Sequence, residues 1–243
     1  MSADVWQIIA ITLIVFISSI IQSSTGIGFA IFATATLAFF LDAITSAALI
    51  SVSAVVFGAV LSFRMRKHIN FAVTIPAMVA MAIARVAGIV ILMNIDEDIS
   101  RLILGVILIL FAVYFCFFSN KVKIKPTPIK GFVLGLLAGF LGGMYSMTGP
   151  FAAIYFYSAL EDKHEYAASM NLAFLPSAVI GFIVHCLYGN ITSAMLPACV
   201  FSCAAILAGT SIGLVILDKI NKKQLSNILY VYMAVAGSFI FIT

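Results

Sequence analysis

The stretch QSSTGIG at residues 22–28 lies in the middle of residues 5–41, a run that contains no Asp, Glu, Lys or Arg. As one straight helix this run would be about 55 Å long at 1.5 Å per residue. That is too long for one crossing of a bilayer core of about 30 Å and too short for two crossings with a loop. The glycines and hydroxyl side chains therefore predict a broken helix or a helical hairpin at this place.

A second interruption of the same kind, GGMYSMTGP at residues 142–150, divides the uncharged run 131–160. This run poses the same problem of length, and its middle is again rich in glycine and hydroxyl groups. We expect a second broken helix or helical hairpin here.

The composition places the whole chain in a membrane. Of its 243 residues 64% are hydrophobic and 9% are charged, whereas about a quarter of the residues in soluble proteins are charged. This leaves too little polar surface for a water-soluble globule and excludes a soluble enzyme, a nucleic-acid-binding protein and a disordered chain. The N-terminus MSADVWQ also lacks the positive charge of a cleavable signal peptide. We predict an all-α polytopic membrane protein.

Charged residues divide the rest of the chain into apolar segments of helical length, and about 20 helical residues cross a bilayer core. The segments that fit one crossing each are 43–63, 70–93, 102–119 and 224–243. The run 166–217 is long enough for two crossings, and we place the division at the Gly189-Asn190 turn signal.

The two halves of the chain resemble each other. The dipeptide Thr-Gly recurs at 25–26 and 148–149, and AGIVILMNI (87–95) aligns with IGLVILDKI (212–220). Many transporter folds contain such internal repeats. We predict two repeats, each with a broken helix or helical hairpin followed by three transmembrane helices. Their boundaries are 1–120 for the first repeat, 121–130 for a cytoplasmic basic linker and 131–243 for the second repeat.

Basic residues predict the orientation, because loops rich in Lys and Arg stay in the cytoplasm. The three basic clusters are Arg64, Arg66, Lys67 and His68; Lys121, Lys123, Lys125 and Lys130; and Lys219, Lys222 and Lys223. The loop 94–101 instead carries three acidic residues. All three clusters lie on one side only if 131–160 enters and leaves the membrane on the same side. The repeats are then inverted, and both termini face outward.

The two interruptions also predict a central binding site. Breaks in membrane helices persist only where they are buried or line a cavity. The N-termini of half-helices offer free N–H groups and the positive end of the dipole, which favour anions. We expect both interruptions to meet near the bilayer midplane and to bind a small oxyanion. The binding residues predicted there are Gln22, Ser23, Ser24, Thr25, Gly26, Gly28, Tyr145, Ser146, Thr148 and Gly149.

Three other glycines have a spacing that is typical of helix packing. Gly135, Gly139 and Gly143 recur every four residues, which lets membrane helices approach closely. For these three we favour packing over ligand binding. For the segments 22–28 and 145–150, where polar residues cluster, we favour a ligand site.

Arg85 is the one Arg or Lys deep inside a predicted span, and such residues are usually functional. It shares a face with Ala80, Ala84 and Gly88, which indicates that it points into the bundle. No Asp or Glu lies deep in any predicted span, so we assign Arg85 to the substrate site as the counter-ion of an anion. The alternative is a structural ion pair or a bond to carbonyl groups at a helix end.

Two polar residues between 166 and 188 are further candidates. We assign Asn171 to the substrate site, where it faces the interruption at 145–150, or else it caps a helix. Histidine side chains exchange protons near physiological pH, so we consider His185 for proton coupling. The alternative is that His185 reaches interfacial water about one turn from the end of its span.

In these motifs the chain resembles the TauE/SafE sulfite exporter family, also called the TSUP family. The resemblance rests on QSSTGIGF (22–29) and on GFLGG (139–143) followed by TGP (148–150), and it covers nearly the whole chain. It implies a transporter of sulfite, thiosulfate, sulfoacetate or a related anion in a bacterial inner membrane. The second motif of the family usually has a run of glycines before the proline. Here Ser146-Met147-Thr148 precede Gly149.

Together these observations predict a secondary transporter that exports a small sulfur-containing anion, such as sulfite, thiosulfate or an organosulfonate, by alternating access. An anion channel with the same site is the alternative. We expect no enzyme, because the spans contain no nucleophile–base pair, carboxylate pair or metal cluster. We also expect no cofactor, no metal and no nucleic acid. The expected partners are the anion and membrane lipids, and a homo-oligomer is left open.

Overall fold

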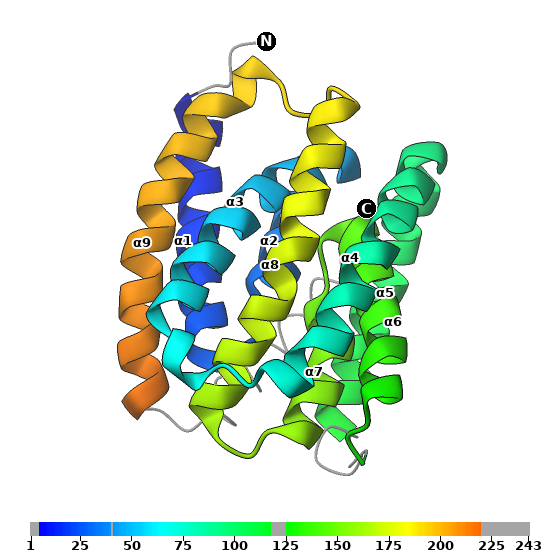
Figure 1. Ribbon diagram of the computed structural model, residues 1–243. Coiled ribbons are helices and arrows are strands. Elements are labelled where there is room, and N and C mark those ends of the chain that lie inside the picture. The colour runs from blue at the N-terminus through cyan, green and yellow to red at the C-terminus, as the bar shows by residue number, and fades with distance from the viewer. Residues whose placement is uncertain (1–4, 40, 118–124, 220–243) are drawn as a thin grey trace.

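The computed structural model describes residues 5–39, 41–117 and 125–219 (Figure 1). These residues form helices and short connections without any strand, so the prediction of an all-α protein is confirmed. The helices are α1 (Val5–Thr25), α2 (Phe29–Leu37), α3 (Ala43–Arg64), α4 (Phe71–Asn94), α5 (Glu97–Phe117), α6 (Pro128–Tyr145), α7 (Gly149–Ala159), α8 (Lys163–Leu187) and α9 (Leu196–Lys219), with the 3-10 turns η1 (Arg66–His68) and η2 (Ser193–Met195).

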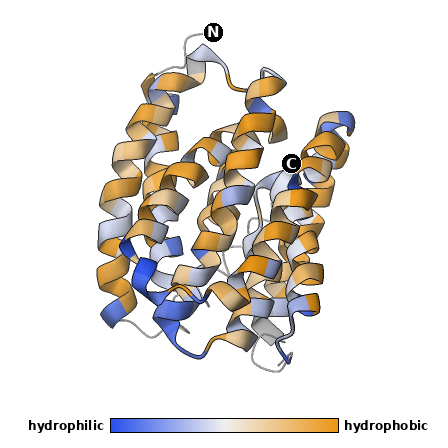
Figure 2. Ribbon diagram, viewed as in Figure 1, coloured by the Kyte–Doolittle hydropathy of each residue, from blue (hydrophilic) through white to orange (hydrophobic). Residues whose placement is uncertain are grey.

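Six of the described helices, α1, α3, α4, α6, α8 and α9, are long and apolar enough to cross a membrane. Hydrophobic residues cover their outer faces (Figure 2), as expected for surfaces in contact with lipid. The predicted division at Gly189-Asn190 is confirmed, because α8 ends at Leu187 and α9 begins at Leu196. The predicted crossing at 224–243 and the basic residues Lys121, Lys123, Lys222 and Lys223 lie outside the described residues.

Both predicted interruptions are confirmed as breaks between two helices. α1 ends at Thr25, and the left-handed residues Gly26 (φ 82°) and Gly28 (φ 121°) precede α2. α6 ends at Tyr145, and Ser146 (φ 58°) is the left-handed residue before α7. α1 contacts α2, and α6 contacts α7. We call residues 22–28 tip 1 and residues 145–150 tip 2.

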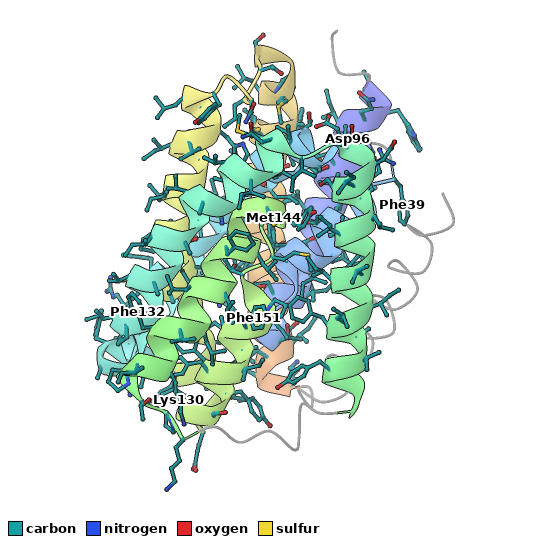
Figure 3. The ribbon with its side chains drawn as sticks, turned by 90° about the vertical axis from the view of Figure 1, so that its right-hand side faces the viewer. Phe39, Asp96, Lys130, Phe132, Met144 and Phe151 are labelled. Carbon is teal, nitrogen blue, oxygen red and sulfur yellow. The ribbon has the colours of Figure 1, made fainter. Side chains whose placement is uncertain are left out.

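The two helix pairs enter the bundle from opposite ends. In Figure 1 α1 descends from the upper end, near the N-terminus, whereas α6 rises from the lower end. Figure 3 shows Lys130 in the first turn of α6 at the lower end, and Phe39 just after α2 toward the upper end. An inverted repeat requires these directions. The inverted repeat itself stays a prediction, since the second-half counterpart of α5 falls outside the described residues.

Charged and polar residues gather at the lower end of the molecule (Figure 2). The end of α3, the turn η1, the start of α6 with the residues just before it, and the end of α9 all lie there, and they carry the described members of the three basic clusters. The acidic loop lies at the other end, where Figure 3 labels Asp96. The described members of the basic clusters therefore share one end, and its assignment to the cytoplasm stays a prediction.

Glycines bring the two halves of the chain into close contact. α4 packs along α6, and α1 packs along α9. A Cβ atom at Gly135, Gly139 or Gly143 would lie 2.2–2.7 Å from a carbonyl oxygen of α4. Gly209 and Gly213 meet α1 in the same way, at 2.7 Å. The packing role predicted for the first three glycines is confirmed.

Capping side chains set several helix boundaries. Asp42 accepts a hydrogen bond from a backbone N–H group in the first turn of α3, and Asp162 does the same at α8. The N–H donor of Glu165 lowers the pKa of the Asp162 carboxyl group. Thr127 caps α6 and Pro128 occupies its first turn, so this helix begins before the boundary that we predict at residue 131.

Candidate functional site

Tip 1 and tip 2 border the same cavity between the helices. Its volume is about 40 Å³, which is room for roughly three water molecules or one small oxyanion. Seven of the predicted site residues line it, namely Gln22, Gly28, Arg85, Ser146, Thr148, Gly149 and Asn171. Most of the remaining wall is apolar, with the residues Phe29, Ala30, Ile31, Ala54, Phe57, Gly58, Phe174 and Ala178.

Arg85 brings a positive charge to this cavity. The residue is 2% exposed, so the prediction that it points into the bundle is confirmed. Its Nη2 donates hydrogen bonds to the hydroxyl oxygens of Ser51 at 2.8 Å and of Ser146 at 3.3 Å. Among the described residues Nε has no partner and no carboxylate forms an ion pair with the guanidinium. A buried charge without a counter-ion is costly, so the site favours an anion.

Two helix N-termini add to the positive potential. α2 begins at Phe29 and α7 begins at Gly149, and both residues line the cavity. The first N–H groups of a helix have no partner within that helix, and the dipole is positive at this end. The cavity therefore combines three features that favour an anion: a buried guanidinium and two helix N-termini.

Tip 1 holds its shape through the side chain of Gln22. Its Nε2 donates to the carbonyl oxygen of Gly26 and to Oδ1 of Asn171, both at 3.1 Å. Its Oε1 accepts the N–H group of Phe29 at 2.9 Å. Asn171 therefore bonds to tip 1, whereas the sequence suggested a contact with tip 2 or a helix cap. Asp162 is the residue that caps α8.

Four predicted site residues of tip 1 do not line the cavity. The hydroxyl groups of Ser23, Ser24 and Thr25 each donate to a carbonyl oxygen of α1 at 2.6–2.7 Å. Gly26 lies against the ring of Tyr166. The physical reason is that α1 continues through Thr25, and Ser or Thr inside a helix can bond to the carbonyl group one turn earlier.

Tyr145 also faces away from the cavity. Its hydroxyl group donates to the carbonyl oxygen of Ser100 on α5 at 2.9 Å, while its own carbonyl oxygen accepts a bond from the Thr34 hydroxyl group at 2.7 Å. Its side chain borders a second, smaller cavity between α2, α3 and α5. Tyr145 therefore anchors tip 2 to α2 and α5.

His185 is fully buried. The alternative that it reaches interfacial water is therefore wrong. Its Nδ1 lies 3.1 Å from Nδ2 of Asn190, and its Nε2 has no partner among the described residues. It does not line the cavity. It lies on the face of α8 that also carries Asn171 and Ala178, because these positions are seven residues apart.

The structure adds residues that the sequence did not indicate. Ser51 bonds to Arg85, and Gly181 packs against the guanidinium. Ser51 is one of several serines in the run 43–63, and nothing in its spacing distinguishes it from Ser53. The aromatic part of the wall comes from apolar residues that look like ordinary core residues in the sequence.

Comparison with known proteins agrees with the resemblance in the motifs. The family model of the sulfite exporter TauE/SafE matches residues 11–240. One relative, described as a probable membrane transporter protein of Methanocaldococcus jannaschii, is 23% identical over 184 residues, which cover 71% of this chain and 69% of the relative. No solved structure matches the chain. The chain belongs to the TauE/SafE sulfite exporter family of membrane transporters.

Proposed function

We propose that this protein is a secondary transporter that exports a small sulfur-containing anion, such as sulfite, thiosulfate or an organosulfonate, across a bacterial inner membrane. One observation carries the proposal: Arg85 is buried at the cavity and pairs with no described carboxylate. An anion is the ligand that compensates this charge. Membership of a transporter family supports the assignment to transport rather than to catalysis.

The proposed anion contacts are the seven predicted residues that line the cavity. Arg85 supplies charge, Ser146 and Thr148 supply hydroxyl groups, and the N-terminus of α7 supplies backbone N–H groups. Gln22 and Asn171 add side-chain amide groups to the cavity lining. We assign Ser23, Ser24, Thr25, Gly26 and Tyr145 to the shape of the tips instead.

Alternating access is the proposed mechanism. Tip 1 and tip 2 reach the cavity on helix pairs that enter from opposite ends. A displacement of one pair relative to the other would open the cavity toward one side at a time. Other transporters with broken helices and internal repeats use this mechanism.

The test is uptake of labelled sulfite, thiosulfate and sulfoacetate into proteoliposomes. A carrier shows saturable uptake and accelerated exchange when unlabelled anion is present on the other side. An anion channel, our alternative, shows flux that rises linearly with concentration and no such exchange. If none of the three anions enters faster than into empty liposomes, the proposed substrate class is wrong.

We place proton coupling at His185, because it is a buried ionisable group on the α8 face that borders the cavity. The variant His185→Gln cannot carry a proton on a ring nitrogen. It should lose the stimulation of uptake by a pH gradient and keep anion exchange at equal pH. If the stimulation persists in this variant, the proton takes another route.

A further inference from the structure

Two residues outside the cavity, Ser51 on α3 and Gly181 on α8, hold the guanidinium of Arg85 from two sides. We infer that they are positioning residues, which orient Arg85 so that its Nη1 end is the donor to the anion. The inference rests on the proposed function. It goes beyond that proposal because it assigns two residues and one donor atom that neither the motifs nor the cavity wall identify.

Ser51 fixes the Nη2 end of the guanidinium. The residue is fully buried, and its Oγ accepts from Nη2 at 2.8 Å. The corresponding distance to Ser146 is 3.3 Å, so Ser51 makes the shorter bond. A serine acceptor is neutral, and it therefore orients the guanidinium without cancelling its charge. A carboxylate at this position would compensate the charge and remove the reason to bind an anion.

Gly181 makes room for the guanidinium against α8. A Cβ atom at this glycine would lie 2.1 Å from Nε, 2.6 Å from Nη2 and 2.7 Å from Cζ of Arg85. Arg85 therefore occupies the space that a side chain at position 181 would need, and any larger residue there would push the guanidinium away. This close contact with α8 also leaves Nε without an acceptor among the described residues.

The remaining donor atom is Nη1. It makes no hydrogen bond to the described residues, and it lies 3.4 Å from the position of a Cβ atom at Gly142, on the side of tip 2. The side chain of Thr148 lies beside that same position, and Thr148 lines the cavity. An arginine has five N–H donors. With Nη2 bonded and Nε facing Gly181, the two donors on Nη1 are the ones left for a ligand.

Ser51→Ala tests the inference, with Ser53→Ala as the matched control. Ser53 lies on the same helix, is 2% exposed, and its hydroxyl group has no partner among the described residues. Uptake kinetics of labelled sulfite and thermal unfolding are measured for both variants. We expect Ser51→Ala to raise KM at least tenfold, the effect of losing one hydrogen bond to a charged group, and to lower the unfolding temperature only slightly. Ser53→Ala should change neither quantity.

Gly181→Ala is the second variant. It should lower uptake at least tenfold, because the added methyl group displaces the guanidinium. It should also lower the unfolding temperature, and this loss should vanish when the same change is made in an Arg85→Ala protein, where the space is empty. An equal loss of stability in both backgrounds would show that Gly181 contacts something other than Arg85.

The results separate this inference from the proposed function. If Ser51→Ala keeps the original KM while Arg85→Met abolishes uptake, the positioning role is wrong and the proposed function stands. Equal losses in Ser51→Ala and Ser53→Ala would also overturn it, since they indicate a general packing defect. If Arg85→Met takes up sulfite normally, the proposed function itself fails.

Discussion

Tip 1 and tip 2 have similar sequences and lie at the same cavity, yet their polar groups have different partners. At tip 1 the groups bond to one another: Gln22 bonds to Gly26, Phe29 and Asn171, and the Thr25 hydroxyl group bonds to the backbone on both sides of the break. At tip 2 the Ser146 hydroxyl group faces Arg85, and that of Thr148 makes no bond to the described residues.

The backbone conformations of the two tips also differ. Tip 1 turns on two glycines, for which positive φ angles cost little, whereas tip 2 turns on Ser146. A serine in the left-handed region is uncommon, and here it places a hydroxyl group beside the guanidinium. Tip 1 is therefore built to be stable, and tip 2 keeps polar groups available for a ligand.

The largest effect is expected on transport, from changes to Arg85, the cation beside tip 2. Arg85→Met should abolish transport and leave the protein folded, because it removes a buried charge that has no described counter-ion. Arg85→Lys keeps the charge but loses the planar group that Ser51 and Gly181 hold, so it should transport more slowly than the original protein. Proteoliposome uptake and size-exclusion chromatography measure the two properties.

The opposite pattern would reassign this residue. If Arg85→Met yields misfolded protein while Arg85→Lys transports normally, Arg85 is a structural brace, and the contrast between a stable tip and a ligand-binding tip fails.

The next effect is expected on stability at tip 1. Gln22→Leu leaves the buried polar groups of Gly26, Phe29 and Asn171 without their partner, which should cost about 3 kcal/mol of unfolding free energy. Ser146→Ala at tip 2 removes two long hydrogen bonds, from Arg85 at 3.3 Å and to the carbonyl oxygen of Ala47 at 3.5 Å, and should cost less. Thermal unfolding of both variants in detergent compares the tips. Equal costs would contradict the division of roles.

A smaller effect separates the two threonines. Thr148→Val should weaken anion binding by about 1 kcal/mol and leave stability unchanged, because its hydroxyl group has no described partner. Thr25→Val should lower stability by a similar amount and leave affinity unchanged, because its hydroxyl group holds the break. Anion affinity from exchange kinetics, paired with thermal unfolding, distinguishes them. If Thr25→Val loses anion affinity and Thr148→Val does not, tip 1 rather than tip 2 is the ligand-binding tip.

The smallest effect is expected from labels at the two ends of the bundle, which leave transport unchanged. Single cysteines replace Lys67 at the basic end and Asp96 at the acidic end, in a protein whose four native cysteines have been substituted. A membrane-impermeant reagent should label position 67 only from the cytoplasmic side and position 96 only from outside. Labelling of both positions from one side would contradict the assigned orientation of the tips.

Much of the fold follows from local properties of the sequence. The length of the uncharged run 5–41 predicted the break before α2. The polar residues clustered in the two interruptions predicted that these two segments border one site. The same reasoning could not tell which hydroxyl groups face the cavity. Ser23, Ser24 and Thr25 were reasonable candidates, but α1 runs on to Thr25 and turns their hydroxyl groups onto its own carbonyl groups.

The sequence alone determined that the chain is a helical membrane protein with two broken segments and one deep cation. Hydropathy, helix breaking and the depth of a charge depend on a residue and its near neighbours, so they can be read along the chain. The partners of Arg85 depend instead on how helices from distant parts of the chain pack together. The close glycine contacts between α4 and α6 bring Ser146 to Arg85, and the packing of α8 against α3 and α4 brings Ser51 and Gly181 to the same guanidinium.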